Sequence, residues 1–91
     1  MKTNEVIQNL KEKILKLEDL EAAATIAEMA YDKDPENEAT ERAFDEAYKK
    51  EYAAFMDVST LLVDLLEIDI ATARAMVNYK RTALLSILGA E

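Results

Sequence analysis

Glycine and proline, the two residues that most often interrupt helices, occur only once each in this chain of 91 residues. Pro35 divides the sequence, and Gly89 lies near its end. The remaining stretches consist mostly of Ala, Leu, Glu and Lys, which have high helix propensities. One apolar series recurs at steps of three and four, as on one face of a helix: Leu10, Ile14, Leu17, Leu20, Ala24, Ala27 and Tyr31. The sequence therefore predicts an all-α fold.

Three helices are expected within a single domain covering residues 1–91. Their approximate ranges are residues 4–32, 35–67 and 70–88, so the third is the shortest. The first is expected to begin at Thr3 or Asn4, because either side chain can accept a hydrogen bond from a free amide of the first turn.

Capping residues predict where the second and third helices begin. Asp34 is expected to cap the second helix, with Pro35 in its first position, where a helix needs no amide hydrogen. Asp69 is expected to cap the third helix, and Gly89 to end it.

A short connection makes the two long helices antiparallel neighbours, and the register of this hairpin predicts which charges meet. Folding about the turn places Lys16 near Glu51 and Glu18 near Lys50. We therefore expect opposite charges to face each other along the rim, although each exposed pair contributes only a few tenths of a kcal/mol.

The third helix is too short to cover the apolar seam of the hairpin. About 19 residues span roughly 28 Å at 1.5 Å per residue, against about 43 Å for each long helix. The end of the chain is apolar around most of its circumference, which is typical of a helix buried on several sides. We therefore expect a two-fold homodimer that completes a helical bundle, with Leu84, Ile87 and Leu88 in the self-association interface.

Aromatic residues gather near the expected turn, and alanines on both long helices offer small surfaces against which rings can pack. We therefore expect packing between the helices and not a ligand pocket for this group, which comprises Tyr31, Phe44, Tyr48, Tyr52 and Phe55.

The charge and the residue types exclude several classes of function. The chain has 11 basic and 19 acidic residues and a net charge of −8, so we expect no direct binding to nucleic acid or to anionic membranes. Without His or Cys, it lacks the side chains of most nucleophilic catalysis and zinc binding. No cofactor, leader peptide or membrane-spanning stretch is expected, which favours a cytoplasmic location.

One local feature runs against the overall charge. Beyond residue 68 the basic residues Arg74, Lys80 and Arg81 outnumber the acidic ones. Arg74, Asn78 and Arg81 recur at steps of four and three, so they form one polar stripe along a helix. This stripe either forms salt bridges with the acidic hairpin or binds a partner protein, and its three residues are the candidate partner-binding site.

The leading functional prediction is a non-enzymatic, small acidic helical interaction protein, such as an adaptor, inhibitor or regulator, that contacts another protein. One alternative is a Mg²⁺-dependent nucleotide hydrolase. Glu38 with Glu41, and Asp64 with Glu67, each place two carboxylates on one helix face, and a dimer interface would bring the pairs together as a metal site. Another alternative is an acidic mimic of nucleic acid that occupies a basic groove.

Overall fold

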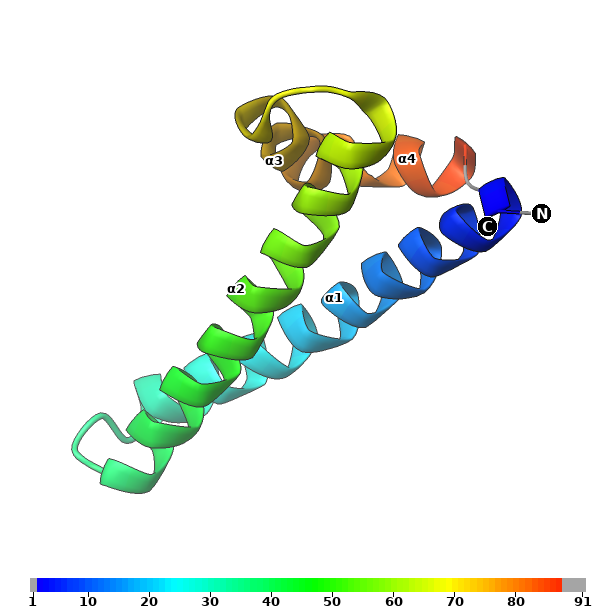
Figure 1. Cartoon of the computed structure of the whole chain (residues 1–91). Helices are drawn as coiled ribbons and strands as arrows, with labels where there is room; N and C mark the ends of the chain where they lie inside the picture. Colours follow the sequence, from blue (N-terminus) through cyan, green and yellow to red (C-terminus); the bar gives the residue numbers. More distant parts are fainter. Residues whose placement is uncertain (1, 88–91) are drawn as a thin grey trace.

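The computed structural model describes residues 2–87 and confirms the all-α fold, with two long helices packed as a hairpin. The helices are α1 (Lys2–Lys33), α2 (Glu38–Leu66), α3 (Ile70–Tyr79) and α4 (Arg81–Ile87). α1 begins two residues earlier than predicted. Figure 1 shows that α1 and α2 meet at the turn and diverge toward their other ends, where α3 and α4 lie across the opening.

The turn differs from the prediction, because the cap of α2 is Asn37 and not Asp34. The Asn37 side chain accepts a hydrogen bond from the amide of Ala39 at 2.9 Å. The Asp34 amide still donates to the Ala30 carbonyl at 3.2 Å, so Asp34 belongs to the end of α1 and cannot yet begin the next helix. Pro35 therefore lies in a turn, which the Asn37 amide closes by donating to the Asp34 carbonyl at 3.1 Å.

The residues predicted as one third helix form two helices that meet at Lys80. Asp69 caps α3 as predicted, since its carboxylate accepts from the Thr72 amide at 2.6 Å. The Lys80 amide donates to the Met76 carbonyl at 2.9 Å, which ends α3, and Lys80 itself leaves the helical conformation. The predicted end at Gly89 lies outside the described residues.

The core lies at the open end of the hairpin, where all four helices contribute. Its buried members are Leu10, Ile14, Leu17, Val58, Leu62, Ala73, Val77 and Leu84. The three residues from α1 belong to the apolar series predicted from the sequence. Each large side chain buried here contributes about 1.5–3 kcal/mol, so this cluster holds α3 and α4 onto the hairpin.

The closed end of the hairpin is only two helices thick. Tyr31 stacks on Phe44 with their ring centroids 5.7 Å apart, and Tyr48 meets Phe44 edge-on at 6.5 Å. The contact between Tyr31 and Phe44 joins α1 to α2, but Tyr48 and Tyr52 stay about half exposed. The molecule is elongated, with a radius of gyration of 15.2 Å, against about 12 Å for a compact chain of this length.

Candidate binding surfaces

Arg81, the first residue of α4, is bound within the chain. Its guanidinium makes two parallel hydrogen bonds to the carboxylate of Glu21 on α1, one of them at 2.9 Å. Its Nε also donates to the Val77 carbonyl at 3.0 Å. The hydrogen bond to Glu21 raises the pKa of Arg81 above its ordinary value, although burial opposes this shift. The ion pair therefore fastens α4 to the middle of α1.

The other two residues of the predicted stripe border a groove between α2 and α3. The guanidinium carbon of Arg74 lies 5.7 Å from the centroid of the Phe55 ring, within range of a cation–π interaction. Asn78 lines the same groove, whose volume is about 220 Å³. A hollow of about 410 Å³ adjoins it and shares Glu21, Tyr48 and Glu51 with it. We call the two together the acidic groove.

Carboxylates crowd this acidic groove. Burial is the main cause that raises the pKa of Glu51, and the negative charges of Glu21 and Glu28 raise it further, while Arg81 partly compensates. A site in which a carboxylate is harder to ionise than usual favours an incoming cation over an anion.

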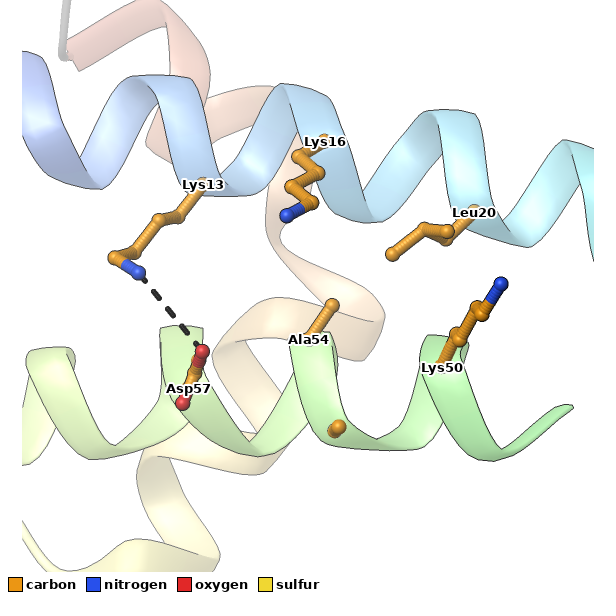
Figure 2. A pocket seen from close by; sticks show the side chains of 7 residues that line it. Lys13, Lys16, Leu20, Lys50, Ala54 and Asp57 are labelled. Atoms are coloured by element: carbon orange, nitrogen blue, oxygen red, sulfur yellow. Dashed lines mark ion pairs between the residues drawn. The ribbon is translucent and has the colours of Figure 1, made fainter. Parts of the chain in front are cut away.

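A second groove lies on the opposite flank of the seam between α1 and α2. Tyr48 and Lys50 are two residues apart on α2, and two residues turn a helix through about 200°, so they face different sides. We call this second concavity, of about 370 Å³, the lysine groove; its lining consists of Lys13, Lys16, Leu20, Lys50, Ala53, Ala54 and Asp57. Figure 2 shows Lys13 and Lys16 extending from α1, and Lys50 from α2, along this groove.

The lysine groove overturns the predicted rim pairs. Lys16 and Lys50 line this groove together, whereas Glu51 lines the acidic groove on the other flank. Among residues 5–87 the ion pair along this rim joins Lys13 to Asp57, with 3.8 Å between Nζ and Oδ2. The prediction failed because an antiparallel register gives the height of a residue along the hairpin but not the flank it faces.

The predicted self-association residues are separated by the structure. Leu84 is only 7% exposed and belongs to the core, whereas Ile87 is 81% exposed. Leu88 lies outside the described residues. Ile87 is therefore the one described member of this group that offers a free apolar side chain.

A second apolar row on α1 was missed at the sequence level. Leu15, Ala22, Ile26 and Met29 recur at steps of seven, four and three, and we call them the outer row. Ile26 is 69% exposed and Met29 is 55% exposed. Ile26 follows the buried Ala24 by two positions, so the row faces away from α2. The same helical periodicity that identified the core face of α1 could also have identified the outer row, because its residues recur at similar steps on another face of the helix.

The four carboxylates of the alternative metal site lie at the two ends of α2. Glu38 begins this helix, and Glu67 ends it in a left-handed conformation with φ of 55°. A helix of 29 residues is about 43 Å long, so the pair Glu38 and Glu41 is far from the pair Asp64 and Glu67. In the part of the chain that the structure describes, no three His, Cys, Asp or Glu side chains are placed to hold a metal ion.

Comparisons with known proteins give no family to which these surfaces can be referred. No protein-family model matches the chain, and no curated sequence or solved structure shows significant similarity to it. Across residues 2–87, no helix is long and apolar enough to cross a membrane. The chemistry of these surfaces is therefore what indicates a function.

Proposed function

We propose that this chain is a non-enzymatic interaction protein whose outer row on α1 packs against a helix of another molecule. The observation that carries this proposal is the exposure of Ile26 and Met29 on a 32-residue helix. The opposite face of α1 is already used by the core and by α2. The outer row is thus a second helix-packing face without a partner in the single chain.

The spacing of the outer row suits a helical partner. Steps of three, four and seven place apolar side chains along one line of a helix, which is the pattern of two helices in a coiled coil. Ala22 within the row allows the backbones to approach closely. Exposed apolar residues are ordinary when scattered singly, but several that recur on one face of a helix mark an interaction surface.

The occupant that we propose is a second copy of this chain. In an antiparallel pair, Ile26 of one copy can lie against Ala22 of the other, so that a large side chain fills the space left by a small one. Two-fold symmetry repeats this contact on both sides of the axis. Self-association through α1 keeps the predicted homodimer but moves its interface from the end of the chain to the outer row.

Sedimentation equilibrium on the full chain tests this proposal. We expect a dimer for the unmodified protein and a monomer for Ile26→Glu, because a buried carboxylate at a helix interface costs several kcal/mol. Ile87→Glu is the matched control, since it places the same charge on another exposed isoleucine. Circular dichroism checks that both variants keep their helix content.

Two results would contradict the proposal. A monomeric unmodified protein at several hundred micromolar would exclude the homodimer. Dissociation by Ile87→Glu, with Ile26→Glu still dimeric, would return the interface to the end of the chain.

A further inference from the structure

The lysine groove is unusual because of the charge that surrounds it. The chain carries a net charge of −8, yet three lysines and one aspartate line this groove. Of these three lysines, only Lys13 has an ion-pair partner among residues 5–87, and that partner is Asp57. Lys16 and Lys50 come from different helices and lack a carboxylate within ion-pair distance in the same part of the chain.

Lys16 and Lys50 place two like charges along the seam between α1 and α2, where opposite charges would stabilise the hairpin. Two like charges that share a groove repel each other, whereas alternating charges would attract. Figure 2 shows Lys16 extending from α1 and Lys50 from α2 into the space between the helices, with Leu20 between them in this view. An anion bound in the groove would offset this repulsion with attractive contacts to the amino groups.

The remainder of the lining is apolar. Leu20 extends into the space between the helices, and Ala53 and Ala54 line the α2 side. The volume of about 370 Å³ lies within the range of ~300–1,000 Å³ that is usual for small-molecule sites. A bare inorganic anion would leave this apolar surface uncovered, so the ligand should carry an apolar body.

We propose that the lysine groove binds a small organic anion, with its acidic head at the amino groups of Lys16 and Lys50 and its apolar body over Leu20 and Ala54. The head is a phosphate, sulfate or carboxylate, since each accepts hydrogen bonds from two ammonium groups. This site lies on a different face from the outer row, so it is independent of self-association.

Titration of the ¹⁵N-labelled full chain with octyl phosphate, below its micellar concentration, tests the site by NMR. We expect saturable shifts of amides in residues 16–20 and 50–57. Inorganic phosphate and octanol, which supply the head or the body alone, should each bind at least about tenfold more weakly. Octanoate, titrated in parallel, shows whether a carboxylate serves as well as a phosphate. Binding should weaken as salt is added, because the lysines are partly exposed.

Two double variants distinguish binding in the lysine groove from a general attraction of the anion to any lysine on the surface. The variant Lys16→Gln/Lys50→Gln should weaken binding of octyl phosphate at least about tenfold, since each charge-assisted hydrogen bond contributes that much. Its melting temperature should not fall, because the substitutions remove a repulsion. Lys11→Gln/Lys49→Gln is the matched control, with one lysine changed on each helix outside the groove, and should bind as the unmodified chain does.

Three outcomes would overturn the proposal. The first is equal affinity of the two double variants. The second is an absence of saturable binding. The third is a set of shifts confined to the outer row of α1, which would show an apolar surface taking up the octyl chain without the lysines.

Discussion

The ion pair between Arg81 and Glu21 should contribute measurably to stability, unlike most ion pairs on protein surfaces. Its two parallel hydrogen bonds join residues 60 positions apart in the sequence, so they hold α4 to α1 directly. The side chains are 17% exposed for Arg81 and 34% for Glu21. This partial shielding from water strengthens the attraction relative to a fully exposed pair.

The free energy that this ion pair contributes should lie between the values for two kinds of interaction. Exposed pairs contribute about 0.2–1 kcal/mol, and hydrogen bonds to charged groups about 1.5–3 kcal/mol. With one partner one-third exposed, we expect a coupling free energy of about 1.5 kcal/mol. In a chain of this length, that loss corresponds to a fall of about 8 °C in melting temperature.

A double-mutant cycle measures this coupling without the side effects of each single change. Glu21→Gln removes the pair but also relieves the repulsion that Glu21 exerts on Glu51, so its own effect on stability is mixed. The cycle therefore uses Arg81→Ala, Glu21→Gln and the double variant, each unfolded in urea and followed by circular dichroism. Arg74→Ala is the comparison, with an expected loss of about 0.5 kcal/mol from its contact with Phe55. A coupling below about 0.3 kcal/mol would refute the argument and leave Arg81 free for a partner.

Three further changes test the turn, the acidic groove and the core. Asn37→Ala should lower the free energy of unfolding by about 1 kcal/mol in urea titrations, and Asp34→Ala by less, because Asn37 supplies the cap. The raised pKa of Glu51 means that the folded chain binds this proton more tightly than the unfolded chain does, so stability falls as the pH rises through the pKa of Glu51. Glu51→Gln should therefore raise the melting temperature at pH 7, and this gain should disappear below the ordinary pKa of about 4.5. Leu62→Ala should lower the free energy of unfolding by about 3 kcal/mol, since Leu62 is fully buried, and a loss under 1 kcal/mol would contradict the assigned core.

The hairpin and the core face of α1 were predictable because both depend on local signals. Leu10, Ile14 and Leu17 keep one helical period, and a single proline separates two stretches of strong helix formers. Asp69 was also predictable as a cap, because it directly precedes the first residue of α3 and its side chain can accept a hydrogen bond from a free amide of the first turn.

The features that were not predicted depend on contacts between helices. Two residues near Pro35 could cap α2, and Asp34 lost this role because its amide still bonds to α1. No residue type near Lys80 marks the break between α3 and α4. The break depends on contacts with other helices, because Val77 before it and Leu84 after it are both buried in the core and Arg81 bonds to Glu21. Pairwise register, likewise, does not reveal the flank on which a side chain lies, so the lysine groove required the three-dimensional arrangement.

The position of the core at one end of the molecule implies that backbone amides along a single helix differ in protection against hydrogen exchange. Amides near Leu17 and Leu62, where all four helices pack together, should exchange only when the whole chain unfolds. Amides in residues 24–33 lie where the hairpin is two helices thick and should exchange through local separation of α1 from α2, at a lower free energy. α1 is therefore a continuous helix with a slow-exchanging half and a fast-exchanging half. The fast half carries Ile26, so a second copy bound there would slow exchange where the single chain opens most readily.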